Sequence, residues 1–416
     1  MALGEVSLPM SRYETLTWPA DPTVPGGRSE RRSFRYQAFV PDPIGALQLS
    51  ISLNVAASVS AAERAIDALN RDPPRLASLE VLARRLLRLE SLASSRIEGL
   101  VLSQRRLARA EMEEDATRDE TARSVLGNVT AMEEAVGLGT SARPLRLRDI
   151  LAVHRTLMLA TTTPQIAGMI RTGQNWIGGN AFNPGRAAFV PPPPAWVPSL
   201  MNDLVVFMNR TDFSPVVQAA IAHAQFETIH PFADGNGRVG RALIHVVLRR
   251  RGLAPRYVPP VSLVLAADAT AYVSGLTAYR EDRSADWIDL FATAIGRAAE
   301  KATDLASRLA ELQADWRERS GKPRRHSSVE ALIVALPAHP ILTVATGQKL
   351  LGRSKQAVNA AIAVLAERGV LRPLTLARRN RAWEARELFD LVDGVERELA
   401  TPDEDGPSAP SPRRRD

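Results

Sequence analysis

The chain has 416 residues, more than one hydrophobic core usually organises, so two or three domains are expected. The absence of cysteine excludes disulfides, thiolate metal sites and a cysteine nucleophile, and it makes a reducing compartment, the cytoplasm, the expected location. The formal net charge of +7 suits anionic partners such as nucleotides, nucleic acid or acidic proteins, but it does not choose among them.

Residues 1–117 are expected to form an N-terminal arm followed by a helical region. The first residues have neither a basic start nor an apolar core, so they do not predict a secretory signal. No apolar run approaches the ~20 residues that span a bilayer, and no membrane contact is expected. Prolines and glycines predict a loop-rich arm over residues 1–40. From Ala57 to Ile97 leucines recur on one helical stripe, and Gly99 is the expected stop.

Helical periodicity continues through residues 118–300, which we expect to form one helical core. The expected helices cover residues 118–138, 147–159, 195–209, 215–229, 266–280, 285–297 and 299–317. The interruption at 171–194 is rich in Gly, Asn and Pro. It predicts an exposed hairpin or flap closed by a rigid proline run, although an ordinary surface loop has a similar composition.

The C-terminal part is expected to contain a helix and an exposed basic linker (301–328), a compact unit (329–394) and a disordered tail (395–416). Three helices and a two-stranded wing in the compact unit predict a winged helix-turn-helix, which makes DNA a candidate partner. The expected contact residues are Lys355, Gln356 and Asn359 on the recognition helix and Arg378, Arg379 and Arg381 on the wing. The alternative is a small interaction module that joins two copies as a homodimer.

The most specific string in the sequence is HPFADGNGRVGR, residues 230–241. Pro231 disfavours the α conformation at His230, so the preceding helix is expected to end there. Phe232 offers an apolar anchor in a polar loop. The turn at Gly235–Gly237 tolerates positive φ and points N–H groups to one side, and a helix that starts at its end adds free N-terminal N–H groups. The string therefore predicts a cradle for an anion.

Charged side chains complete the predicted site. Arg238 and Arg241 lie three apart on the first helical turn, where guanidinium groups suit phosphates. Asp234 beside phosphates would be costly unless Mg²⁺ bridges them, and a nucleotide brings that ion. His230 is the group here that can accept a proton near neutral pH. The alternative is a plain helix–loop–helix connection with a capping aspartate and solvated arginines.

The complete string resembles the HPFx(D/E)GNGRxxR signature of the Fic family (filamentation induced by cAMP), and every signature position is matched. The resemblance implies a mainly α fold, with a Fic-type helical core and a small β-hairpin flap. It also implies an enzyme that moves AMP from Mg²⁺-bound ATP to a Ser, Thr or Tyr hydroxyl of a target protein, with pyrophosphate leaving.

The same resemblance implies roles for single residues. His230 would be the general base, and Asp234 would hold the Mg²⁺ that bridges the α- and β-phosphates. The ATP phosphates would be held by the turn, with the Asn236 side chain, and by the two arginines after it: Gly235, Asn236, Gly237, Arg238 and Arg241. No further metal fixed by the protein is expected, because His, Asp and Glu do not cluster elsewhere.

A second string, SSRIEG at residues 94–99, is similar to the (S/T)xxxE(G/N) inhibitory motif of Fic proteins that carry it before the core. Ser94 and Glu98 are four apart and share a helix face, and Gly99 completes the motif. In the family the glutamate pairs with the second signature arginine, here Arg241, and obstructs the productive γ-phosphate position. The alternative is a solvated surface glutamate. Some relatives use this glutamate to orient water and remove AMP.

Other positions are assigned with alternatives. The segment 177–190 resembles the family's flap, which aligns an extended stretch of the target by strand-like pairing. Tyr272 stands where relatives place groups near the nucleobase, or it is a core tyrosine at helical spacing. His223 and His245 lie on amphipathic helices and are expected to be structural.

The leading hypothesis is a protein adenylyltransferase that is autoinhibited by Glu98 against Arg241. A DNA-binding regulator whose Fic core senses nucleotide or modifies only itself is the alternative from another class. Transfer of phosphate, as in Doc-like relatives, is a third hypothesis, and the intact Gly237 disfavours it.

Overall fold

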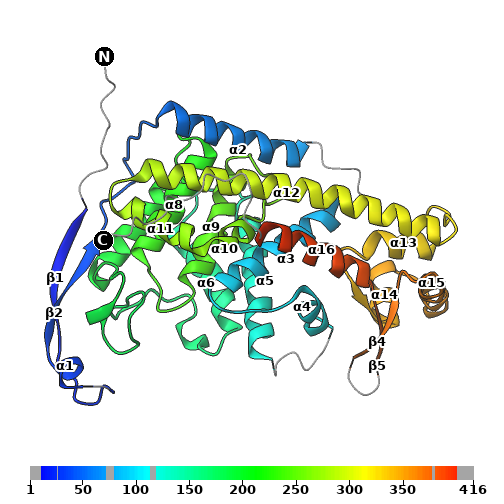
Figure 1. The fold of residues 1–416 in the computed structure, drawn as a ribbon, viewed down its shortest axis with the longest axis horizontal. Coiled ribbons are helices and arrows are strands. Elements are labelled where there is room, and N and C mark those ends of the chain that lie inside the picture. Colours follow the sequence, from blue (N-terminus) through cyan, green and yellow to red (C-terminus); the bar gives the residue numbers. More distant parts are fainter. Residues whose placement is uncertain (1–10, 26, 72–78, 113–118, 377–379, 401–416) are drawn as a thin grey trace, which may run out of the picture.

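The fold is that of a computed structural model, which describes residues 11–25, 27–71, 79–112, 119–376 and 380–400 (Figure 1). The protein is mainly helical, as the sequence predicts. The helices are α1 (Arg28–Arg31), α2 (Leu53–Arg71), α3 (Leu79–Ile97), α4 (Gln104–Ala110), α5 (Glu120–Leu138), α6 (Leu147–Leu159), α7 (Val197–Met208), α8 (Pro215–Ile229), α9 (Asn236–Arg250), α10 (Val261–Ala267), α11 (Ala269–Arg280), α12 (Ser284–Arg319), α13 (Ser328–Ala335), α14 (Val344–Leu351), α15 (Lys355–Glu367) and α16 (Arg386–Ala400). The strands are β1 (Arg12–Trp18), β2 (Phe34–Val40), β3 (Ile341–Leu342), β4 (Arg372–Leu376) and β5 (Asn380–Glu384).

The long helix α12 organises the molecule. It runs along most of the length, with α2 packed on one side of it and α8, α10 and α11 on the other (Figure 1). The antiparallel pair β1–β2 lies at one end of the molecule, and the C-terminal unit of α13–α15 and the antiparallel sheet β3–β5–β4 lies at the other (Figure 1).

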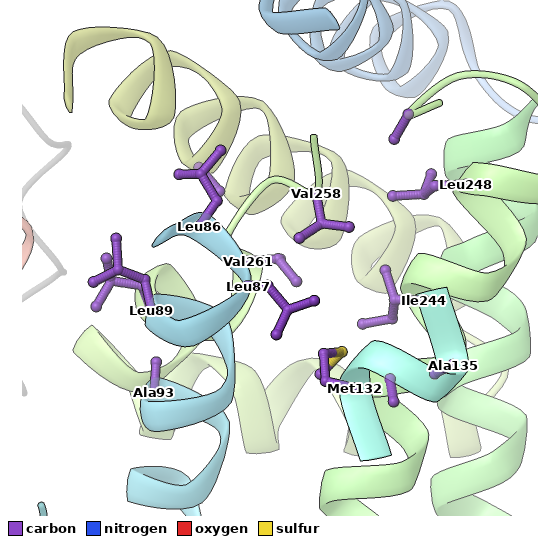
Figure 2. Close-up of a cluster of buried hydrophobic side chains, with 14 of the residues drawn as sticks. Leu86, Leu87, Leu89, Ala93, Met132, Ala135, Ile244, Leu248, Val258 and Val261 are labelled. Atoms are coloured by element: carbon purple, nitrogen blue, oxygen red, sulfur yellow. The ribbon is translucent and has the colours of Figure 1, made fainter. Parts of the chain in front are cut away.

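Helices α3, α5 and α9 are held together by apolar side chains. Figure 2 shows Leu87 of α3, Met132 of α5 and Ile244 of α9 meeting beside Val258 and Val261, and all five are buried. Each such side chain contributes about 1.5–3 kcal/mol when it leaves water. This packing fixes the end of α3 against the start of α9, which is where the two sequence motifs meet.

Several predicted boundaries are confirmed, and others are wrong. Helices α6 and α8 have the expected limits, and α14, α15 and the β4–β5 hairpin occupy the expected positions. The two helices expected over 285–317 are one helix, α12, which continues to Arg319. Trp316, expected in an exposed linker, is fully buried, and its Nε1 donates to Glu387 at 2.6 Å. The buried face of α12 continues past residue 298, where a break between two helices was expected. It also continues to Trp316, so the linker does not begin at that residue.

The two ends of the chain also differ from expectation. The loop-rich arm contains the β1–β2 hairpin, in which Arg12 lies opposite Val40. The expected disordered tail begins too early, because α16 extends to Ala400; residues 401–416 lie outside the described residues. Glu396 of α16 accepts a hydrogen bond from Arg96 of α3 at 2.7 Å, a contact between distant segments that local sequence patterns do not encode.

The flap has less strand structure than expected. Ile177 and Phe189 form an isolated antiparallel bridge, and the segment has no longer ladder. The N–H of Phe39 in β2 donates to the carbonyl of Val190, and Trp18 of β1 packs edge-on against Trp176 at 5.4 Å between ring centroids. The β1–β2 hairpin therefore packs against the flap and supports it.

Within the described residues no single helix is long and apolar enough to cross a membrane. The pair α10 and α11 passes the length and composition test only when joined, and it is bent by 102°.

A buried polar cluster connects α3, α9 and α10. Glu90 of α3 is fully buried, and its carboxylate accepts hydrogen bonds from the N–H of Ser262 at 2.8 Å and from the Ser262 hydroxyl at 2.5 Å. Nε2 of His245, on α9, lies 3.1 Å from Glu90 Oε1. His245 lies in the buried core, as its expected structural role requires, and Glu90 satisfies both donors of Ser262.

We expect Glu90→Ala to lower the free energy of unfolding by about 3 kcal/mol, because it leaves these buried donors without an acceptor. Equilibrium unfolding in urea measures the change. Glu80→Ala on the same helix is the matched control, since its side chain is 86% exposed, and it should change stability by less than about 0.5 kcal/mol. Equal effects of the two substitutions would contradict the assigned role of Glu90.

Candidate functional site

The signature loop begins with a strained residue. Helix α8 ends at Ile229, and His230 caps it in the left-handed region with φ 49°. A histidine is uncommon there, and such conformations persist only where surrounding contacts hold them. The expected helix end at His230 is confirmed, and the kink turns the imidazole back towards the last turn of α8.

Phe232 is the anchor of the loop, as predicted. It is fully buried and stacks on His154 of α6 with ring centroids 3.7 Å apart. The Asn236 amide closes the loop: its Oδ1 accepts from the N–H of Phe232, and its Nδ2 donates to the carbonyl of the same residue, both at 2.8 Å. These bonds use Oδ1 and one of the two Nδ2 hydrogens, and the expected phosphate contact of the Asn236 side chain stays a prediction.

His154 is a functional residue that the sequence patterns missed. The N–H of Gly168 donates to its Nδ1 at 3.0 Å, so Nε2 carries the proton and donates to the Asp234 carbonyl at 3.0 Å. Burial lowers the pKa of His154 to about 4, so the ring is neutral and acts as a fixed support for the loop.

Arg171, just before the flap, was also missed. Its Nε donates to the carbonyl of His230 at 2.9 Å, and its own N–H donates to the carbonyl of Pro231 at 2.9 Å. Burial lowers the pKa of Arg171 to about 10, but the guanidinium remains charged near neutrality. Arg171 thus holds the backbone carbonyls of two consecutive residues, His230 and Pro231.

The start of α9 forms the predicted anion cradle, and a carboxylate already lies in it. Gly235 adopts φ 81° as the helix N-cap, so the turn needs glycine there. A Cβ added at Gly237 would lie 2.0 Å from Oε1 of Glu98, which shows how closely this carboxylate approaches the helix start. The positive end of the helix dipole favours an anion at this point.

The inhibitory string and the signature meet at Arg241. This side chain is 1% exposed; its Nε donates to Ser94 Oγ at 2.9 Å, and its Nη2 donates to the Ser94 carbonyl at 2.7 Å. Nη2 also pairs with Glu98 Oε1 at 2.8 Å. Gly99 has φ 80° and reverses the chain after α3, as expected for a helix stop.

Opposing effects set the ionisation of this pair. Burial acts to raise the pKa of Glu98, but the charge and hydrogen bond of Arg241, together with the charge of Arg238, outweigh it, and the pKa is lowered. Burial likewise acts to lower the pKa of Arg241, while Glu98, Tyr272 and Glu227 together raise it above its usual value. Both groups are therefore charged near neutral pH, and each satisfies the other in a buried site.

A cavity of about 270 Å³ opens beside this pair, lined by Glu98, Ser124, Thr161, Asp234 and Arg238, among others. Arg238 is buried and donates to Ser124 Oγ at 3.1 Å, and its Nη2 lies 3.8 Å from Asp234 Oδ1. The Asp234 side chain is 56% exposed, so its carboxylate is open to a ligand. Asp234, Arg238 and Glu98 thus share one polar cavity.

A second, larger opening lies beside the signature loop that follows His230. A groove of about 670 Å³ lies between the segment before the flap, with Ile166 and Met169, and the flap, with Trp176; Ala233 of the signature lines it too. The His230 side chain is 18% exposed and its Nδ1 is buried, so Nε2 is the accessible nitrogen. Burial lowers the pKa of His230 to about 4, and Arg171 adds to this effect. The imidazole is therefore neutral near pH 7 and free to accept a proton.

Tyr272 does not line either opening. It is 4% exposed, and its hydroxyl lies 2.7 Å from Nε2 of His223. The expectation of a nucleobase contact is thus replaced by the alternative of a core tyrosine, because the ring packs between α8 and Trp287 of α12. His223 is structural, as expected.

The residues fit a Mg²⁺–nucleotide, although no group of three or more His, Asp or Glu that could hold a metal alone occurs in the described part of the chain. The exposed Asp234 carboxylate offers one oxygen ligand, and Arg238 and the helix N-terminus supply positive charge for phosphates. Mg²⁺ usually binds through one or two carboxylates together with substrate phosphates, which matches this donor set.

Two family models match the chain. Residues 144–248 match the model described as Fic/DOC family, and residues 56–137 match the Fic/DOC family N-terminal model. The first contains the signature loop, and the second contains the inhibitory string.

Curated relatives from several animals are named protein adenylyltransferases. The protein adenylyltransferase fic-1 of Caenorhabditis elegans is 35% identical over 133 residues, which cover 31% of this chain and 23% of that protein. The protein adenylyltransferase Fic of Aedes aegypti is 38% identical over 114 residues, 27% of this chain and 21% of that protein. The match therefore spans about a quarter of the length of these relatives.

Among solved structures, a Fic family protein from Desulfovibrio desulfuricans aligns with 81% of this chain and 97% of its own, with 22% sequence identity and a TM-score of 0.48.

Proposed function

We propose that this chain, a member of the Fic/DOC family through residues 56–137 and 144–248, is a protein adenylyltransferase that moves AMP from ATP to a hydroxyl side chain of a target protein. The observation that carries the proposal is the signature loop. It combines the start of α9, suited to an anion, with a neutral, partly exposed histidine, and Ala233 of the same loop lines an open groove. The names of the curated relatives support the same activity.

The proposed reaction consists of one proton transfer and one substitution at phosphorus. Nε2 of His230 accepts the proton of the target hydroxyl, and the oxygen attacks the α-phosphorus of ATP. The bond from that phosphorus to the β-phosphate bridging oxygen breaks, and pyrophosphate leaves with the electron pair. A positioned base typically contributes about 10²–10⁴-fold to such a step, and orientation in the groove contributes more.

Phosphate binding falls to the start of α9. The backbone of Gly235, Asn236 and Gly237 would face the α- and β-phosphates, and Arg238 would neutralise charge beside them. Asp234 would hold Mg²⁺, which when bound neutralises developing charge on the phosphate oxygens. The groove beside the flap would receive an extended segment of the target. Location in the cytoplasm and assembly into a homodimer stay predictions.

We further propose that Glu98 inhibits the enzyme. Its carboxylate lies against Gly237 and keeps Arg241 engaged, so an incoming phosphate meets a like charge where it needs a cation. Coulomb repulsion in a poorly solvated site makes this placement costly. The same carboxylate is suitably placed to orient water for AMP removal, which is an alternative activity of the same site.

We expect His230→Ala to reduce AMP transfer to targets and to itself below detection, because the proton acceptor is lost. ATP affinity should change by less than about threefold, since the phosphate contacts lie on α9. Labelling with an ATP analogue tagged on the adenine measures transfer, and calorimetry measures affinity. His326→Ala is the control, as that histidine lies on a distant turn. Normal labelling by His230→Ala would contradict the assignment.

We expect Glu98→Gly to raise transfer at least about tenfold, because Arg241 becomes free to bind phosphate and the like charge disappears. The same labelling assay reports it, with exposed Glu300→Gly as the matched control. Activity equal to that of the unaltered protein would remove the proposed inhibition while leaving transfer itself intact.

The C-terminal unit favours a second candidate function, DNA binding. The order of α13, α14, α15 and the β4–β5 hairpin matches the winged-helix expectation, and Lys355, Gln356 and Asn359 at the start of α15 are exposed. Arg381 is exposed on β5, whereas Arg378 and Arg379 lie outside the described residues. We propose that this face contacts duplex DNA in the manner of a recognition helix.

A gel shift with random-sequence and promoter DNA tests this function. We expect binding that weakens steeply with salt, and Lys355→Glu should weaken it about tenfold or more by adding a negative charge to the phosphate-facing surface. Lys301→Glu on α12 is the charge-matched control. Equal binding by both variants, or no shift at low salt, would contradict DNA contact through α15.

A further inference from the structure

A buried carboxylate outside the signature lies next to the proposed base. Glu227 is on the last turn of α8, three residues before His230, and its side chain is 9% exposed. Its Oε2 lies 3.9 Å from Nδ1 of His230. Neither Oε1 of Glu227 nor Nδ1 of His230 has a hydrogen-bond partner, although both atoms are buried. Buried polar atoms are nearly always paired. An unpaired Nδ1 that lies 3.9 Å from one oxygen of a carboxylate whose other oxygen is also unpaired therefore requires an explanation.

The neighbouring helix leaves space for this carboxylate. A Cβ added at Gly240 of α9 would lie 2.3 Å from Oε1 of Glu227. Any larger residue at position 240 would displace the Glu227 side chain. The signature HPFx(D/E)GNGRxxR leaves this position free, so a reason for glycine lies in the contact with Glu227.

Charged groups face the pair from every adjoining element. Arg241 of α9 and Arg280 of α11 lower the pKa of Glu227, and Glu98 after α3 raises it. Burial is the largest effect, and it raises the pKa of Glu227 to about 7. Arg171 acts on His230 from the flap side and lowers its pKa. Glu227 is therefore a carboxyl group that changes charge in the range where the enzyme would work.

We propose that Glu227 is the positioning residue of His230: its carboxylate accepts a hydrogen bond from Nδ1–H and so leaves Nε2 unprotonated towards the target hydroxyl. This inference rests on the transferase function proposed above. The gap of 3.9 Å exceeds a charge-assisted hydrogen bond by about 1 Å, and such contacts commonly tighten when substrate closes the site. A carboxylate that fixes the tautomer of a catalytic imidazole is a recurrent solution in unrelated enzymes.

The pair also accounts for the charge that the reaction creates. When Nε2 accepts the hydroxyl proton, the ring becomes an imidazolium in a buried site that also contains Arg171 and Arg280. An ionised Glu227 compensates this positive charge, and Nδ1–H remains bonded to it. The proton leaves later from Nε2, so Glu227 itself gains no proton in the step.

NMR of the imidazole nitrogens tests the inference without relying on activity. The chain contains six histidines, so the His230 signals can be assigned by their loss in His230→Ala. In the unaltered protein we expect Nδ1 to carry the proton above the pKa of Glu227 and the His230 shifts to respond as Glu227 ionises near pH 7. In Glu227→Gln the response near pH 7 should vanish and the preference for the Nδ1–H tautomer should weaken, because the carboxylate that accepts from Nδ1–H is lost.

Thr228→Val is the matched control for this titration. Thr228 is the next residue on α8, it is buried, and its hydroxyl donates to the carbonyl of Ala224. Its removal should leave the His230 titration unchanged. An unchanged tautomer, together with a His230 response near pH 7 that persists in Glu227→Gln, would overturn the inference, whatever the catalytic activity.

Kinetics in the Glu98→Gly background provide the second readout. Adding Glu227→Gln should lower kcat about 10²-fold with the KM for ATP within about twofold, since the base is affected and the phosphate site is not. In the Glu98→Gly protein, kcat should rise with pH as Glu227 ionises. That rise should lie below about pH 7, because the loss of Glu98 lowers the pKa of Glu227. Adding Glu227→Gln should remove the rise. If kcat and its pH profile are unchanged, the positioning role is wrong. If Glu98→Gly and the unaltered protein both transfer nothing, the transferase proposal fails, and the NMR titration still decides the role of Glu227.

Discussion

Burial of the Arg241 guanidinium is the constraint on which the rest of the site depends. At 1% exposure this permanently charged group needs an anion and acceptors within the protein, and Ser94 and Glu98 supply them. The packing of α3 against α5 and α9 brings those acceptors to it. A phosphate of bound ATP would be another anion able to pair with Arg241. The proposed inhibition therefore follows from competition between a carboxylate and a phosphate for one buried cation.

The chemistry of the loop depends on a second consequence of burial. Desolvation lowers the pKa of His230 and His154 to about 4, so both imidazoles are neutral, but they do different work. His154 has both nitrogens bonded and supports the turn, whereas His230 has an accessible Nε2 and a buried Nδ1 beside Glu227. Local burial selects the protonation state, and hydrogen-bond partners then determine which ring can react. Arg171 adds precision by holding the backbone around the strained His230.

The sequence predicted what is local and missed what depends on tertiary contact. The limits of α6 and α8, the cap at His230 and the Phe232 anchor follow from spacing and backbone chemistry within a few residues. No local pattern marks His154, Arg171 or Glu227. The first two contact segments distant in sequence, and Glu227 approaches His230 only because the packing of α8 sets which side of its last turn is buried. Tyr272 failed for a related reason: the core pairs its hydroxyl with His223, which local sequence does not show. The single helix α12 was divided because periodicity does not reveal how far a neighbouring surface extends.

Intact-mass spectrometry of the Glu98→Gly protein, incubated with Mg²⁺ and ATP in the presence of a host lysate, tests the central claim most directly. The account predicts that the protein or a lysate target gains the mass of one adenosine monophosphate on a hydroxyl side chain, and that His230→Ala in the same background gains none. A gain of phosphate alone, or an adenylylated product that persists without His230, would contradict it.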